Sequence, residues 1–107
     1  MTLNTYNPGS TVKILYSPVD GNGAAYDPPV VKHHYTDSQG TDYTKIYGTD
    51  AVATRLSAGN YQLVISIPYT NASAGEWNGD SQSLDGSANS LNVEKFRFIV
   101  RRLATLD

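Results

Sequence analysis

Hydrophobic and polar residues alternate most clearly between Tyr61 and Pro68. Tyr61, Leu63, Ile65 and Ile67 fall on one side of this alternation, and Gln, Val and Ser residues fall on the other. Such a period of two is typical of a β-strand with one face on a hydrophobic core. A Ser-Ala-Gly-Asn turn precedes the run, and the proline ends it. We therefore expect a central strand here, with its Tyr61 face directed inward.

Shorter segments elsewhere alternate in the same way and are separated by turn residues. Further strands are expected at residues 11–16, 30–36, 41–47, 51–56 and 91–101. Short strands at fairly regular spacing favour an all-β sandwich or barrel. No window has a convincing helical period, and the weakest alternative is a short helix near residues 50–55. The predicted core consists of Val12, Ile14, Val31, Tyr35, Val52, Leu56, Tyr61, Leu63, Ile65, Trp77, Phe96, Phe98 and Val100.

Three segments fall outside this pattern. Residues 1–10 are polar and rich in turn formers, so we expect an extended N-terminal arm that becomes ordered when a partner binds. Residues 78–90 are almost all turn formers and predict a long loop, of the kind that is either mobile or used for binding. Residues 103–107 are expected to form a short C-terminal tail. The predicted domain, a β-sandwich, spans residues 11–102.

Composition narrows the classes of function. The 107 residues suit one domain with one core, and the absence of cysteine excludes disulfides and thiolate metal sites. A net charge of -2 gives no electrostatic case for nucleic-acid binding. No signal peptide and no membrane-spanning run is visible, so we expect synthesis in a cytoplasm and no membrane partner. Eight tyrosines, against two phenylalanines and one tryptophan, suit exposed sheet faces and protein interfaces.

The sequence offers little catalytic or metal-binding chemistry. His33 and His34 are adjacent on an expected strand, so their rings point to opposite faces and do not easily chelate one ion; one partly buried and one exposed histidine is the expected arrangement. The Asp20–Gly23 segment, and Asp80 with Asp85, offer oxygen ligands for Ca²⁺, but neither fits the regular acidic loop. Turn formation explains these residues equally well, and we expect no cofactor.

An enzyme is not expected, because no nucleophile, base and orienting acid fall into a recognisable motif. The carboxylates of Asp37, Asp42, Asp50 and Glu76 all fall at expected turns or edges rather than in a cleft. Asn71 begins an Asn-Ala-Ser sequence that matches the N-glycosylation pattern, which we attribute to chance because no signal peptide precedes it.

A docking surface for a protein partner is the remaining candidate site. Lys95, Arg97, Arg101 and Arg102 place basic charge along the last expected strand, where it either protects an edge strand from aggregation or docks an acidic patch. Exposed tyrosines favour an interface as well. The candidate partner-docking residues are Tyr6, Pro8, Tyr47, Tyr69, Arg97 and Arg101.

The order of these signals resembles that of the small immunoglobulin-like structural proteins of tailed-phage virions, over about residues 8–101. The matching motifs are Gly9-Ser10-Thr11-Val12, Asp27-Pro28, Asp37-Ser38-Gln39-Gly40, Arg55-Leu56-Ser57, Gly59-Asn60-Tyr61, Gly75-Glu76-Trp77 and Phe98-Ile99-Val100. The resemblance implies an immunoglobulin-like antiparallel β-sandwich of about seven strands. Tyr61, just after a glycine-bearing corner, is similar to the tyrosine corner of such domains, whose hydroxyl ties down the preceding loop. One departure is that Trp77 is followed by the polar 78–90 segment, where the family pattern continues as an alternating strand.

The resemblance also implies a function without catalysis. The family includes head decoration or cement proteins, neck proteins and tail-surface domains, and a capsid decoration or cement protein is the leading expectation. Its partners would be the major capsid protein or other virion structural proteins, with a homo-oligomer as a further option, and its location would be the virion. A neck or tail component is one alternative. A carbohydrate-binding β-sandwich module, which would stack sugars on exposed aromatic rings, is another.

Overall fold

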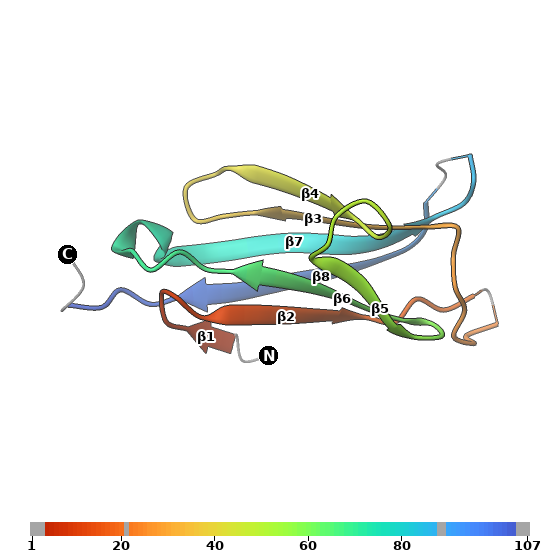
Figure 1. Cartoon of the computed structure of the whole chain (residues 1–107), viewed down its shortest axis with the longest axis horizontal. Helices are drawn as coiled ribbons and strands as arrows, with labels where there is room; N and C mark the ends of the chain where they lie inside the picture. The colour runs from red at the N-terminus through yellow and green to blue at the C-terminus, as the bar shows by residue number, and fades with distance from the viewer. Residues whose placement is uncertain (1–3, 21, 88–89, 105–107) are drawn as a thin grey trace.

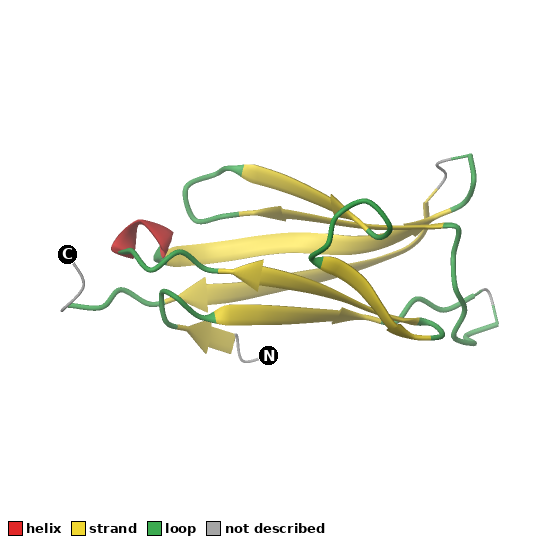
Figure 2. Ribbon diagram, viewed as in Figure 1, coloured by secondary structure: helices red, strands yellow, loops and turns green. Residues whose placement is uncertain are grey.

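Two β-sheets pack face to face and enclose the hydrophobic core (Figures 1 and 2). The computed structural model describes residues 4–20, 22–87 and 90–104. Within these ranges there is no α-helix, and the short 3₁₀ helix η1 (Asn71–Ser73) lies at one end of the molecule. The strands are β1 (Asn4–Tyr6), β2 (Thr11–Tyr16), β3 (Val30–Thr36), β4 (Asp42–Ile46), β5 (Ala53–Ser57), β6 (Asn60–Ser66), β7 (Gly75–Leu84) and β8 (Ser90–Val100).

The strand order explains how segments far apart in sequence come together. One sheet has five strands in the order β1-β8-β7-β3-β4, and the other has three in the order β2-β6-β5. All neighbouring pairs are antiparallel except β1 and β8, which run parallel. The predicted all-β class and the two-sheet architecture are therefore confirmed, and the segment 30–36 was predicted with its observed bounds.

A row of aromatic rings crosses the inner face of the five-stranded sheet, with one ring from each strand. Tyr43 stacks on Tyr35 with 4.8 Å between ring centroids, and Tyr35 stacks on Trp77 at 6.3 Å. Trp77 in turn stacks on Phe98 at 5.7 Å, and Tyr6 meets Phe98 edge to face at 5.5 Å. Each such pair contributes about 0.5–1.5 kcal/mol beyond the burial of its surface. The row therefore connects all five strands on the core side.

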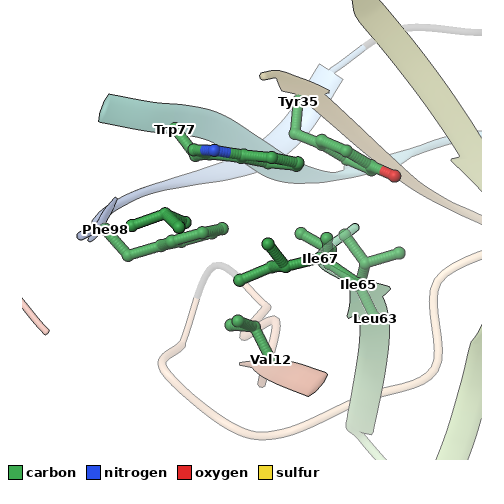
Figure 3. Close-up of a cluster of buried hydrophobic side chains, with 8 residues drawn as sticks. Val12, Tyr35, Leu63, Ile65, Ile67, Trp77 and Phe98 are labelled. Atoms are coloured by element: carbon green, nitrogen blue, oxygen red, sulfur yellow. The ribbon is translucent and has the colours of Figure 1, made fainter. Parts of the chain in front are cut away.

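Aliphatic side chains of the three-stranded sheet cover this row. Figure 3 shows Val12 from β2 and Ile65 from β6 on the side of the core opposite the rings of Tyr35, Trp77 and Phe98. Ile67, just beyond β6, joins them and is 3% exposed. The alternation that predicted the central strand is confirmed, because the Tyr61 face of β6 is the buried one.

Loop anchoring at the other end of β6 depends on a carboxylate. Asp27 accepts hydrogen bonds from the Tyr61 hydroxyl at 2.9 Å and from the Gly59 backbone N–H at 2.8 Å. It also receives two bonds from the Arg55 guanidinium, at 3.1 and 2.9 Å. These donors, Arg55 foremost, hold the pKa of the Asp27 carboxyl well below its usual range. The loop before β3 is thereby fastened to the β5–β6 turn.

The prediction of a loop at residues 78–90 is wrong for the first seven of these residues, because residues 78–84 belong to β7. This strand lies between β3 and β8 and pairs with both along most of its length. Its outward positions from Glu76 to Gln82 are polar, and its inward positions after Trp77 are Gly79, Ser81 and Ser83. Turn-forming residues here make a strand because neighbours on both sides satisfy its backbone, which tertiary pairing can impose against local propensity. Residues 88–89 lie outside the described part of the chain.

The predicted strand at residues 51–56 was assigned the wrong inward face. Val52 and Leu56, both placed in the core, are 37% and 55% exposed, whereas Ala53 is 3% exposed. The observed β5 begins at Ala53 and carries an irregularity between Arg55 and Ser57. A shift of one residue moves every side chain to the opposite face of a sheet. Of the other predicted core residues, Ile14 and Phe96 are half-buried and the rest are buried.

The predicted N-terminal arm is part of the fold from Asn4 onward. β1 pairs with the end of β8, and Pro8 is buried. At the C-terminal side, Leu103 exchanges two hydrogen bonds with the Asn71 side chain, at 2.8 and 2.9 Å. Residues 1–3 and 105–107 of the predicted arm and tail lie outside the described residues.

Gly79 supplies a test of the strand assignment, because β7 passes too close to its neighbours for any side chain there. A Cβ on Gly79 would meet the His34 carbonyl oxygen, the Phe96 ring at 2.7 Å and the Tyr35 Cα at 2.8 Å. We expect Gly79→Ala to lower the free energy of unfolding by about 3 kcal/mol or more, since overpacking against backbone is not easily relieved. Gly86→Ala, where nothing lies within 4 Å, is the matched control and should change it by less than about 0.5 kcal/mol. Urea denaturation of both variants measures the difference, and equal stabilities would contradict the observed β7.

Candidate functional site

Four of the six predicted docking residues gather at one end of the sandwich. The Arg101 backbone N–H donates to the Tyr6 carbonyl at 2.9 Å, so β1 and the end of β8 are joined there. Pro8 precedes Gly9, whose N–H donates to the Ile67 carbonyl and whose Cα lies beside the Tyr69 ring. The C-terminal end of the described chain and η1 are at the same end, on the left in Figure 1.

Only two of these four side chains are available to a partner. Tyr69 is 72% exposed, and Arg101 is exposed. Pro8 is buried, and Tyr6 is half-buried against Phe98, so both stabilise the fold instead. The docking role of Pro8 stays a prediction, and its ring is covered by the molecule itself.

Tyr47 and Arg97 lie elsewhere. Tyr47 is 44% exposed and packs edge to face on Tyr61, at 5.5 Å between ring centroids. Arg97 lies 3.4 Å from the Glu76 carboxylate on the neighbouring strand, and Asp80 stands directly opposite Lys95. The expected basic stripe is thus accompanied by acids from β7, and the face of the five-stranded sheet carries mixed charge.

A hollow that sequence reasoning missed opens at the same end as Tyr69. It has a volume of about 210 Å³ and lies between the β3–β4 turn and the segment that leads from β6 through η1. Tyr35, Tyr43 and Trp77 of the aromatic row line it, together with polar residues such as Asp37 and Thr70.

Hydrogen bonds across the hollow fix its two walls relative to each other. The Ser38 hydroxyl and the Gln39 side-chain amide both donate to the Ala72 carbonyl, at 3.2 and 3.0 Å. On the floor, the Trp77 indole N–H donates to the Ser73 carbonyl at 2.8 Å. The bonded residues of the β3–β4 turn and η1 are 34 and 33 residues apart in sequence, so no local pattern indicates that they meet.

Asp37 organises the β3–β4 wall. Its Oδ1 accepts the backbone N–H groups of Gln39 and Thr41, at 2.9 and 3.0 Å, and its Oδ2 accepts the Tyr43 hydroxyl at 3.1 Å. The hydrogen bond to Asp37 raises the pKa of the Tyr43 hydroxyl. Burial, followed by the charges of Tyr43 and Asp37, raises the pKa of Tyr35 as well. Both hydroxyls therefore stay protonated near neutral pH and act as neutral polar groups.

The two histidines point to opposite faces of β3, as predicted. His33 is fully buried and His34 is partly exposed, 3.7 Å from the Asp42 carboxylate. The His33 Nδ1 makes a 2.7 Å hydrogen bond with the Ser81 hydroxyl, and its Nε2 has no hydrogen-bond partner. Burial lowers the pKa of His33 from 6.5 to about 4, so the ring is neutral at pH 7.

The proposed calcium ligands are not brought together. Asp20 Oδ1 accepts the backbone N–H groups of Asn22 and Ala24, at 2.8 and 3.0 Å, which is the geometry of a turn. Asp80 lies within β7, and Asp85 follows the end of that strand, about 16 Å away along an extended chain. Gly21 of the first candidate lies outside the described residues.

Comparison of the chain with protein-family models, with curated proteins and with solved structures returns no significant match. In the described ranges, no helix has the length and apolar character needed to cross a membrane.

The buried His33 predicts a loss of stability in mild acid. The unfolded chain takes up a proton near pH 6.5 and the folded chain only near pH 4, so stability is complete above pH 6.5 and falls as the pH decreases between these values. The expected loss by pH 4.5 is about 2.5 kcal/mol. Urea denaturation between pH 7 and pH 4.5 measures it, above the range in which Asp27 takes up a proton in the unfolded chain.

Two variants identify the residue responsible. His33→Gln should flatten this pH dependence, whereas His34→Gln, which changes the partly exposed neighbour, should leave it intact. An unchanged pH dependence in His33→Gln would show that another group is responsible.

Proposed function

We propose that this chain is an immunoglobulin-like, non-enzymatic structural protein of a bacteriophage virion, namely a capsid decoration or cement protein. Three observations support the proposal: the order of the strands, the contrast between the two outer faces of the sandwich, and the motif order that resembles virion proteins of this kind.

The strand order supports the immunoglobulin-like part of the proposal. If β2 to β8 are taken in sequence as strands B, C, C′, D, E, F and G, then one sheet reads B-E-D and the other G-F-C-C′. β1 adds a first strand beside G. Two hallmarks are displaced, because Tyr61 lies in the strand that corresponds to E instead of F, and Trp77 lies in F instead of C. The Tyr61 hydroxyl donates to Asp27 in the loop between B and C. It therefore fastens that loop, whereas the loop directly before Tyr61 was expected.

The contrast between the two outer faces is the observation that carries the docking function. On the three-stranded sheet, Lys13 is the one charged side chain of the described outward positions, and it stands opposite Val64. Leu15 beside it is 65% exposed, and Val52, which precedes β5 and accepts the Val64 backbone N–H, is 37% exposed. The neighbouring outward residues Thr11, Gln62 and Ser66 are polar but uncharged, so the face combines exposed apolar side chains with very little charge, as protein-binding faces do. We call it the apolar face.

The outer face of the five-stranded sheet differs in its charge, although Val93 of β8, which pairs with Gln82, is 51% exposed on it. Its outward residues include both signs of charge, so that it interacts favourably with water and poorly with an apolar seam. The charged and titratable residues on it are Lys32, His34, Asp42, Glu76, Asp80, Lys95 and Arg97. We propose that the apolar face lies on the capsid seam and that the charged face points to solvent. Many copies fixed by capsid symmetry make a modest affinity per copy sufficient.

No described feature favours the carbohydrate-binding alternative. Sugar-binding modules need exposed rings close together, whereas Tyr47 and Tyr69 lie near opposite ends of β6, about 20 Å apart. The rings that line the hollow are stacked on one another, so Tyr43 alone keeps a face that no described ring covers.

Co-sedimentation with empty capsids, assembled from the major capsid protein of the same genome, tests the proposal. Leu15→Lys adds a charge to the apolar face at an exposed position, so it should preserve the fold and weaken capsid binding by about tenfold or more. Thr44→Lys adds the same charge to the outer face of the other sheet and should bind as the unchanged protein does.

Each other outcome points away from the proposal. Equal binding of Leu15→Lys and the unchanged protein would show that the apolar face is not the docking face. A complete lack of capsid binding, with a defined ring of subunits in light scattering, would favour a neck or tail component. Retention on a polysaccharide column would favour the carbohydrate-binding module.

A further inference from the structure

The hollow beside η1 carries one negative charge and no positive one. Asp37 is the one charged residue among those that line it. No described lysine, arginine or histidine forms an ion pair with Asp37. The hollow therefore repels anions and attracts a cation. The other lining residues decide which kind of cation fits.

The Asp37 carboxylate has room for another hydrogen-bond donor. Its Oδ1 already accepts two backbone N–H groups, and its Oδ2 accepts only the Tyr43 hydroxyl. An ionised carboxylate offers about four acceptor positions, so about one remains, on Oδ2. Oδ1 holds the turn and Oδ2 faces the tyrosine that lines the hollow, which separates a structural role from a binding role within one side chain.

The aromatic wall suits a flat cation. Tyr35 covers one face of the Tyr43 ring, and no other described ring contacts Tyr43, which lies on the edge strand β4. A guanidinium group is planar, stacks on tyrosine faces and donates hydrogen bonds in a fixed fork. The Tyr35 hydroxyl on the same wall offers a further acceptor.

The size of the hollow indicates a side chain instead of a whole ligand. Its volume of about 210 Å³ is below the roughly 300–1,000 Å³ of pockets that enclose small molecules. Interfaces commonly concentrate affinity in a pocket of this kind, which receives one anchor residue of the partner, and arginine is among the residues enriched there.

We propose that this hollow is a socket for an arginine side chain of the protein partner, with Asp37 as its counter-ion and Tyr43 as the surface on which the guanidinium stacks. This inference rests on the proposed docking function, since it names the chemistry by which the partner is held at the η1 end. The hollow fixes the register of the complex, while the apolar face contributes area.

The binding test uses the full chain and Nα-acetyl-arginine amide. Trp77 is the only tryptophan of the chain and lines the hollow, so its fluorescence reports binding there. We expect a saturable change with the arginine compound and none with Nα-acetyl-citrulline amide, which has the same shape but no charge. Backbone amide shifts of Gln39 and Thr41, recorded by NMR in the same titration, decide the result if the fluorescence does not respond.

Asp37→Asn removes the charge but keeps an acceptor oxygen for the turn, so it should weaken arginine binding about tenfold. Asp20→Asn is a matched control, because Asp20 makes the same pair of turn hydrogen bonds far from the hollow, and its affinity should match that of the unchanged protein. Equal responses to arginine and citrulline, no response by either method, a response to simple sugars alone, or equal affinities of the two variants would each overturn the proposal.

Capsid co-sedimentation of Asp37→Asn separates this inference from the proposed function. Weaker capsid binding than Asp20→Asn supports the socket in the complex. Unchanged capsid binding would overturn its role in docking while leaving the proposed function standing. If no variant binds capsids, the virion proposal fails, and the arginine titration still tests the socket.

Discussion

The fold depends most on the aromatic row that crosses the five-stranded sheet. Tyr43, Tyr35, Trp77, Phe98 and Tyr6 come from five different strands, and their contacts lie on the inner face where the sheet meets β2 and β6. Because aromatic pairs prefer stacked or edge-to-face contact, the row constrains how the strands lie relative to one another in addition to burying apolar surface. The same row ends in the hollow at Tyr43, so the order of the core and the shape of the candidate site have a common cause.

The small side chains of β7 explain how polar residues are tolerated in the middle of the sheet. Gly79, Ser81 and Ser83 are small, and they leave space on the inner face for larger neighbours such as His33 and Phe96. A strand built from such residues has almost no hydrophobic pattern of its own. Its stability comes from backbone pairing to β3 and β8, and from Trp77, the one large inward side chain near its start.

The sequence was informative where a strand has one polar and one apolar face. The segments that became β2, β3 and β6 alternate clearly, and their inward residues were predicted from that alternation. The pattern failed for β7, whose turn formers are held in a strand by neighbours, and for β5, where an irregularity shifts the inward position to Ala53. The hollow was beyond prediction, because it depends on a turn at Asp37 and a 3₁₀ helix at Asn71 meeting in space. No sequence spacing encodes that meeting.

The parallel pairing of β1 with β8 has a mechanical consequence. Asn4, Thr5 and Tyr6 lie beside Phe98, Ile99 and Val100 in the same direction, so the chain enters this pair at one end and leaves it at the other. Tension applied between the two ends of the chain would slide these strands past each other, and the hydrogen bonds would bear the load together instead of opening one after another. The parallel pair of β1 and β8 is thus loaded in shear geometry, which protects the hydrophobic core from forces applied to either end of the chain.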